Sequence, residues 1–345
     1  MNRIKSENTT ILDIAKKANV SIATVSRAIN PDTRHKVAPE TLEQIDALVK
    51  KFIYTPNLAA KNMRATRLKT VGFLVPHFPN IFLSEYHSKV FSGVSNVLMD
   101  SDYRLKLILM KRHQPKWDGH LFKSSEGVDG LVMESWPELF SKKLQIDVPS
   151  VVISDPEENT SVHFVAVDNV HGGELAAKRL YESGHERIAV LMGHEWSSDS
   201  WLRLKGFKQW MHRVGTAVPQ EMIYRANYEE EDAAKIVDQI FLQKKKVTAF
   251  FCCNDNMALG VLRKLKQLNI RCPQQISVIG FDDESRGRYS DPALTTIHMP
   301  TQELGQTAAK ILLDHLKENS PEKALRGTTL LPVSLVERKS VGPAS

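Results

Sequence analysis

From Thr70 onward, short apolar runs alternate with longer stretches whose apolar residues recur at helical spacing, and this alternation limits the fold more than any other feature. Strands are predicted at 71–75, 105–110, 130–133, 150–154, 164–167, 188–192, 249–253 and 276–281. Helices are predicted at 84–99, 172–183, 201–214, 229–242 and 257–268. Apolar strands separated by helices form parallel, doubly wound sheets. Because the unit recurs in two successive runs, we predict two similar α/β lobes.

The start of the chain has a different pattern, which predicts two short helices joined by a tight turn. Apolar residues within 11–18 have helical spacing, and Thr10 can cap the start of this helix. Ser21 can cap a second helix over 22–29, whose apolar side chains face one side. Such a pair is typical of a helix-turn-helix, whose second helix enters the major groove of DNA through its N-terminal residues.

The positive charge of the chain is concentrated in this first part. Residues 1–69 hold 13 Lys and Arg against 6 Asp and Glu, whereas the remaining 276 residues hold 33 against 34. The net charge of +6 therefore arises in the head. A basic head suits the neutralisation of DNA phosphates with release of counterions. A basic segment without a DNA partner is the alternative, but this segment has the pattern of a folded domain.

Specific motifs connect the chain to a known family. Residues 11–30 read Ile-x-Asp-Ile-Ala-x-x-Ala-x-Val-Ser-x-x-Thr-Val-Ser-Arg-x-Ile-Asn, which resembles the DNA-binding head of the LacI/GalR family of bacterial repressors. Later motifs resemble the effector-binding core of that family, which is similar to periplasmic sugar-binding proteins; they lie at 166–173, 183–188, 203–207, 253–260, 279–283 and 292–297. The resemblance implies a DNA-binding repressor whose operator affinity is switched by a small molecule bound between two lobes.

The second helix supplies the expected DNA contacts. Arg27 can bind a guanine edge through two hydrogen bonds, while Ile22 and Ala23 can offer apolar contact to thymine methyl groups. Polar residues of the same segment are expected at phosphates, which position the protein without reading sequence. These residues are Ser21, Thr24, Ser26 and Asn30. A homodimer would then bind a pseudo-palindromic, double-stranded operator.

A third helix is predicted over 39–52, and the segment that follows it, 54–64, resembles the hinge helix of the family. In the family this helix forms when two chains lie side by side on DNA, and a leucine enters the minor groove. Met63 stands at the leucine position here, and it is long and apolar enough to act as a wedge. Asn57 and Lys61 are further expected DNA contacts. A plain interdomain linker is the alternative.

Three polar residues are expected to bind the effector, because ligands of such folds lie at the carboxyl ends of the strands. Arg203, Asn254 and Asp282 offer a guanidinium, an amide and a carboxylate, which together can bind several hydroxyl groups. The resemblance implies a sugar or a sugar acid. Other residues expected at the site are Asp168, Tyr228, Phe82, Tyr86 and Trp196. Helix or turn caps are the alternative for the aspartates and Asn254, and a surface charge for Arg203.

The loop 193–200 bears on the class of effector. Purine-binding members of the family carry an additional arginine in this loop, and Ser197 is the nearest match here. This difference argues against a purine base, although a purine or another metabolite remains the alternative effector. We expect the bound molecule to change the angle between the lobes and thereby to shift operator affinity.

The expected organisation is an all-α head followed by an α/β core of periplasmic-binding-protein type. A helix-turn-helix domain would occupy 1–56 and a hinge helix with linker 57–69, leaving 70–345 for effector binding and dimerisation. Within the core, the N-terminal lobe would comprise about 70–167 and 300–326. The C-terminal lobe would comprise about 168–299 and 327–345.

Other classes of protein fit the sequence less well. No apolar run reaches membrane-spanning length and the start lacks a signal-peptide pattern, so a cytoplasmic protein is expected. Cys252 and Cys253 are neighbours in a predicted strand and point to opposite faces, so neither a metal site nor a disulfide is expected. Motifs of hydrolases, zinc peptidases and phosphate loops are absent from the sequence, and we assign no catalytic residue and no cofactor. A transport-type sensor without DNA function is the alternative.

Overall fold

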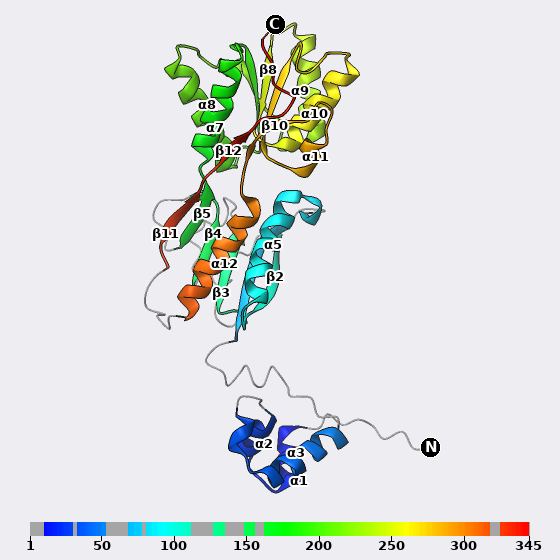
Figure 1. Ribbon diagram of the computed structural model, residues 1–345, viewed down its shortest axis with the longest axis vertical. Coiled ribbons are helices and arrows are strands. Elements are labelled where there is room, and N and C mark those ends of the chain that lie inside the picture. Colours follow the sequence, from blue (N-terminus) through cyan, green and yellow to red (C-terminus); the bar gives the residue numbers. More distant parts are fainter. Residues whose placement is uncertain are drawn as a thin grey trace, which may run out of the picture. The chain divides into compact units, whose positions relative to one another are not determined.

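The computed structural model describes residues 10–29, 33–52, 68–77, 81–111, 127–134, 148–155, 162–317 and 325–344. They belong to two compact units, a head within Met1–Leu68 and a core within Lys69–Ser345, shown in Figure 1. No helix in these ranges is both long enough and apolar enough to cross a membrane.

Two capped helices open the head. Helix α1 (Ile11–Ala18) starts after Thr10. The Thr10 hydroxyl accepts a hydrogen bond from the backbone N–H of Asp13, and the Asp13 carboxylate accepts one from the backbone N–H of Thr10. Helix α2 (Ile22–Ile29) starts after Ser21, whose Oγ accepts from the backbone N–H of Thr24 at 3.1 Å. Both predicted caps are confirmed.

A third helix completes the head. Pro39 is the first residue of α3 (Pro39–Lys51), where its missing N–H costs no hydrogen bond. A short 3-10 turn, η1 (Arg34–Lys36), joins α2 to α3. The three helices share an apolar core of Ile14, Ala15, Ala18, Val25, Ala28 and Ile45. The predicted inward faces therefore meet as expected.

The core contains two six-stranded sheets, one per lobe. The first has the order β11-β5-β4-β3-β1-β2, and its neighbouring strands are parallel. Its strands are β1 (Thr70–His77), β2 (Arg104–Lys111), β3 (Gly130–Glu134), β4 (Ser150–Ile153), β5 (His163–Val167) and β11 (Gly327–Leu331). Helices α5 (Glu85–Met99) and α12 (Thr301–Lys317) pack against each other, and the 3-10 turn η2 (Ile81–Leu83) precedes α5.

The second lobe repeats this plan with the order β12-β10-β9-β8-β6-β7. Its strands are β6 (Ile188–Met192), β7 (Ile223–Arg225), β8 (Ala249–Cys252), β9 (Ser277–Asp282), β10 (Thr295–His298) and β12 (Ser334–Val336). Its helices are α7 (Asn169–Glu182), α8 (Ser198–Arg213), α9 (Glu230–Leu242), α10 (Asp255–Gln267) and α11 (Ser285–Arg288), with a 3-10 turn η4 (Gln220–Met222). Strand β12 runs antiparallel to β10, so the predicted all-parallel arrangement is wrong at this edge.

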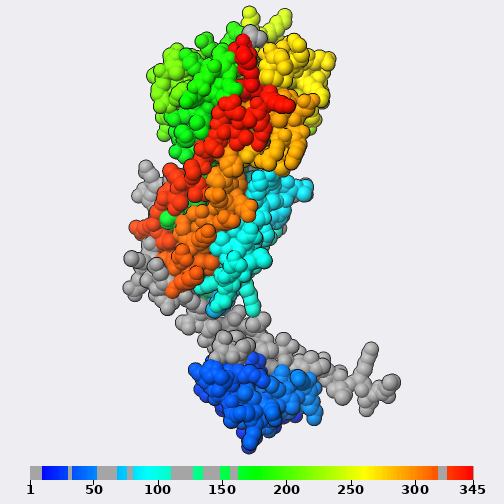
Figure 2. All heavy atoms as spheres, viewed as in Figure 1, coloured from blue at the N-terminus to red at the C-terminus, as the bar shows by residue number. Residues whose placement is uncertain are grey.

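The eight predicted strands are all present within a few residues, but the boundary of the lobes at 327 is wrong. Residues Gly327–Leu331 form β11, which pairs with β5 in the first sheet, and the chain enters the second lobe only after Leu331. Within the described ranges, the chain passes between the lobes after β5, after β10 and after β11, as Figure 1 shows. In Figure 2 the red C-terminal segment lies across the faces of both lobes.

Candidate DNA-binding surface and interlobe site

Helix α2 turns a small and polar face to solvent. Val25 and Ala28 are buried in the head core, which leaves the remaining positions outward. The exposed residues of this segment are Ser21, Ala23, Ser26 and Arg27, and the partly exposed ones are Ile22 and Thr24. Ile22 also packs against the core of the head, so only part of its side chain is available to a thymine methyl. Contacts of these residues with DNA stay predictions.

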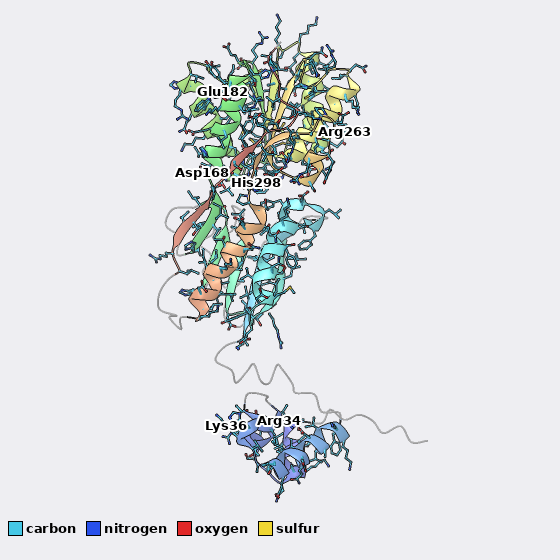
Figure 3. The ribbon with its side chains drawn as sticks, viewed as in Figure 1. Arg34, Lys36, Asp168, Glu182, Arg263 and His298 are labelled. Atoms are coloured by element: carbon cyan, nitrogen blue, oxygen red, sulfur yellow. The ribbon has the colours of Figure 1, made fainter. Side chains whose placement is uncertain are left out.

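The loop after α2 is tied to α3 by an arginine that the sequence analysis did not single out. Arg34 donates to the carbonyl of Ala28 at 3.0 Å and to the Asp46 carboxylate of α3, with which it forms an ion pair. This hydrogen bond lowers the pKa of Asp46. Arg34, labelled in Figure 3, therefore fixes the C-terminal end of α2 relative to α3. Four predicted DNA contacts, Asn30, Asn57, Lys61 and Met63, lie outside the described residues.

In the core, Arg203 is the centre of a buried polar network between the lobes. Its Nε donates to Asn169 Oδ1 at 2.8 Å, and its Nη1 donates to the carbonyl of Cys253 at 2.5 Å and to Asp282 Oδ1 at 3.3 Å. The guanidinium lies 3.7 Å from the ring centroid of Phe281. At 4% exposure Arg203 is not a surface charge. It joins α7, β8 and β9 from α8.

Close packing of α7 on α8 brings Asn169 and Arg203 together. A Cβ on Gly173 of α7 would lie 2.0 Å from the carbonyl oxygen of Arg203, a distance that no side chain can accept. Gly206 of α8 approaches α7 in the same way, since its Cβ would lie 1.9 Å from the carbonyl oxygen of Val170. The two glycines thus allow backbone contact between the helices.

Two acids from different lobes meet beside this network. Asp155, just after β4, lies in the first lobe, and Asp199, at the start of α8, lies in the second. The amide of Asn169 donates to Asp199 Oδ1 at 2.9 Å and lies 3.3 Å from both carboxylate oxygens of Asp155. Burial raises the pKa of Asp155 to about 8, and the charge of Asp199 adds to this rise. The Asp155 carboxyl therefore keeps its proton at neutral pH.

Tyr228 forms one wall of this region. Its hydroxyl lies 2.6 Å from the Ser197 hydroxyl, which also caps α8. A Cβ on Gly193 would lie 2.0 Å from the Tyr228 ring, so the ring occupies space that only a glycine leaves open. Trp196 is partly buried and stacks on His194, with ring centroids 4.8 Å apart. Burial raises the pKa of Tyr228, which stays neutral.

The first lobe contributes a second wall from α5 and β3. Burial raises the pKa of Tyr86 well above its ordinary value, and the charges of Glu134, Asp199 and Asp282 act in the same direction. Tyr86 therefore lies within range of acids from both lobes. Glu134 closes β3, and its Oε2 lies 2.6 Å from His87 Nδ1.

The residues that were predicted to bind the effector lie at different distances from the centre of the interlobe network. Arg203 and Asp282 form the centre of the site, and Tyr86 and Tyr228 lie around it. Asn254 is buried, and its side chain caps α10 by accepting from the backbone of Met257.

Two other residues that were predicted to bind the effector make contacts with residues close to them in the sequence. Asp168 caps α7 by accepting from the backbone of His171, and Figure 3 places it at the junction of the lobes. Phe82 is 41% exposed and packs against the edge of Phe91. For Asp168 and Asn254, the cap that was the alternative reading is present.

Four residues of the interlobe region were missed by the sequence analysis, although signals for them existed. Glu134 and Asp155 lie at or just after the end of an apolar strand, as Asp282 does. Asn169 is adjacent to the predicted Asp168, and Asp199 lies at the start of a helix that faces the same edge. The common signal, an acid or amide where a strand ends, applies to more residues than the three that were chosen.

Comparison with known proteins identifies relatives of both units. A model of bacterial regulatory proteins, lacI family, matches residues 10–57, and a model of a periplasmic binding protein-like domain matches 177–341. The chain is 33% identical over 339 residues to the HTH-type transcriptional repressor PurR of Vibrio atlanticus (strain LGP32), which covers 96% of this chain and 98% of that protein. PurR of Vibrio vulnificus (strain CMCP6) is 34% identical over 321 residues, covering 91% and 94%.

Solved structures agree on the fold. The lac repressor dimer bound to operator and the anti-inducer ONPF is similar with a TM-score of 0.81 at 24% identity, covering 97% of this chain and 100% of that one. The transcriptional regulator CelR in complex with cellobiose has a TM-score of 0.71 at 25% identity, covering 96% and 99%. A regulator from Enterococcus faecalis V583 with bound ribose has a TM-score of 0.64 at 28% identity, covering 80% and 100%.

Proposed function

Because the chain belongs to the LacI family of bacterial regulatory proteins, we propose that it is a cytoplasmic transcriptional repressor whose operator affinity is switched by a small polar molecule bound at the interlobe network. The observation that carries the switch is the arrangement around Arg203. Buried polar groups from both lobes converge there, because Asn169, which accepts from Arg203, also donates to Asp155 of the first lobe. A molecule that bonds to both sides stabilises one interlobe angle over others.

A homodimer on a pseudo-palindromic operator is the proposed working form. Two copies of α2 would then enter successive major grooves, with Arg27 reading a base in each half-site. Support comes from the exposed side chain of Arg27 and from the excess positive charge of the head. We assign no enzymatic step to the protein.

A sugar is the proposed effector, with a purine as the second candidate. The sugar is favoured by hydrogen-bonding side chains that suit hydroxyl groups and by the cellobiose and ribose bound to structural relatives. The purine is favoured by the name PurR of the relatives at 33–34% identity. Ser197, which bonds to Tyr228 and caps α8, stands where purine-binding members have an arginine.

The DNA role is tested by binding-site selection from a random duplex pool. The parent protein should return a palindromic consensus. The variant Arg27→Ala should return a consensus with relaxed preference at one position of each half-site, since a bidentate contact discriminates by about 1–3 kcal/mol. Lys16→Ala, which removes an exposed cation of α1, is the control for a general loss of positive charge. An unchanged consensus for Arg27→Ala would remove its base-reading role.

The effector class is tested by a thermal-shift screen of sugars, sugar acids and purine bases with the whole chain. A molecule that binds the folded state in excess raises the melting temperature by mass action. Operator binding is then measured with each molecule that raises it. If only purine bases raise the melting temperature, the effector is a purine and not a sugar.

A further inference from the structure

The polar network between the lobes holds more acids than bases. Four carboxyl groups gather there, those of Glu134 and Asp155 from the first lobe and those of Asp199 and Asp282 from the second. Arg203 is the cation of this group, and its Nε and Nη1 donors already bond to Asn169, Cys253 and Asp282. Other titratable groups of packed elements face these residues; they are His87, Tyr86, Tyr228, Cys253, Asp255 and Glu284.

Glu134 provides an independent sign that a donor is missing. Its side chain is 4% exposed, and its Oε2 is engaged by His87. Its other oxygen, Oε1, is buried and has no hydrogen-bond partner among the residues that the structure describes. A buried carboxylate oxygen without a donor costs free energy, so such an atom is expected to meet an N–H or O–H group of a ligand. Glu134 lies opposite Ile153 on the neighbouring parallel strand β4, two residues before Asp155, so both acids lie at the carboxyl ends of adjacent strands.

The contact between Asp155 and Asp199 points to the charge of that ligand. Each lobe contributes one acid, and both are oriented by the amide of Asn169. Two carboxyl groups can stay this close only with a proton between them or with a cation beside them. A cation that replaces the proton would join the lobes by attraction to both acids.

We propose that the effector carries a protonated amine, which binds between Asp155 and Asp199 with Glu134 nearby. This inference rests on the proposed function, because it takes the interlobe network as the effector site, and it narrows the effector to an amine-bearing polar molecule such as an amino sugar. A sugar acid is thereby excluded. On binding, the R–NH₃⁺ group keeps its protons, the proton of the Asp155 carboxyl passes to water, and both carboxylates accept hydrogen bonds from the ammonium.

The test compares sets of molecules that differ only in this group, using calorimetry and thermal shift on the whole chain. One set is ethanolamine, ethylene glycol and glycolate, and the other is glucosamine, glucose and glucuronate. The amine of at least one set should bind about tenfold or more tightly than its alcohol and carboxylate counterparts, as for a charge-assisted contact. The variant Asp199→Asn should lose this preference, and Asp155→Asn gives the same comparison if the first variant is unstable.

A second readout is the pH dependence of the amine. Because Asp155 keeps its proton up to about pH 8, the affinity of ethanolamine, whose amine stays protonated over this range, should rise by up to about tenfold per pH unit between pH 6 and 8. Equal or tighter binding of an alcohol or carboxylate overturns the proposal, and so does the absence of binding by both amines. Failure of the repressor function is seen separately, as loss of operator binding in protein that still binds the amine.

Discussion

At the scale of single residues, Arg203 holds several segments of the second lobe together. Three partners from three elements accept from its guanidinium, and a phenylalanine ring covers one of its faces. Asp282 takes a positive φ of 114°, and Tyr228 one of 63°, conformations that side-chain-bearing residues rarely adopt. Such backbone conformations persist where the surrounding structure holds them, and they gather at functional sites.

Removing the arginine should expose how far this network depends on it. Arg203→Met leaves Asp282 buried without its cation and should lower the free energy of unfolding by about 3–5 kcal/mol. The double variant Arg203→Met/Asp282→Leu should lose less than the sum of the two single variants, measured by urea unfolding. Lys205→Met, an exposed position on the same helix, is the control and should change stability by less than about 0.5 kcal/mol. Strict additivity would refute the coupling.

The raised pKa of Asp155 predicts the pH dependence of stability. In the folded protein the pKa of Asp155 is raised to about 8 from its ordinary value of 3.8. The protonated carboxyl therefore makes its full contribution to the free energy of unfolding below about pH 4. This contribution is lost as the pH rises through about 8. Asp155→Asn cannot ionise, so near pH 8.5 it should be more stable than the parent by on the order of 1 kcal/mol or more, and the gap should shrink towards pH 5.

Urea unfolding at both pH values measures this difference, with Asp168→Asn as the control. Asp168 is a carboxyl at the lobe junction that serves as a helix cap. A stability difference that is the same at both pH values would mean that the Asp155 carboxyl is not protonated in the folded protein.

At the scale of elements, α5 of the first lobe contacts α11 of the second. The Glu85 carboxylate accepts from the backbone N–H of Ser285 at 3.0 Å and from its hydroxyl at 2.6 Å, and it is also paired with Lys89. This contact joins residues 200 positions apart and spans the two lobes. It therefore favours the interlobe angle seen here.

Breaking this contact should open the core without unfolding it. Glu85→Ala removes a partly exposed interaction of about 1 kcal/mol, enough to shift an equilibrium between two angles about fivefold. Spin labels at the exposed positions Asn96 and Gln267 should then report a larger share of long distances. Ser285→Ala, which keeps the backbone donor, should have a smaller effect. An unchanged distance distribution in Glu85→Ala would show that the contact does not set the angle.

At the scale of the whole molecule, the head and the core are separate compact units. Each has its own apolar core, so the folding of one does not require side chains of the other.

The separation predicts that the core works alone as a sensor. A chain beginning at Lys69 should fold and should show the same ligand-induced rise in melting temperature as the full chain. It should also lose retention on DNA at low salt, since the excess positive charge lies before it. Thermal shift and filter binding on both chains make the comparison. A core that needs the head in order to bind ligand would contradict this independence.

Local interactions explain which features were predictable. Helix caps such as Thr10 and Ser21, and the buried strands of the core, depend on neighbours within a few residues, so periodicity and residue type were sufficient to find them. Edge strands were missed because β7 and β12 have three residues each, and short strands form through their partners instead of their own apolar pattern.

The sequence by itself determined the two units, the buried face of α2 and the position of Asp282 at the end of a strand, because each follows from spacing along the chain, whereas Arg203 lies within α8 and not at its start. Only the tertiary structure decided that β11 belongs to the first sheet and that Asp155 meets Asp199 beneath Asn169. Those contacts join segments that lie far apart in sequence. Their chemistry depends on burial and on neighbouring charges, which exist only once both lobes are folded and face each other.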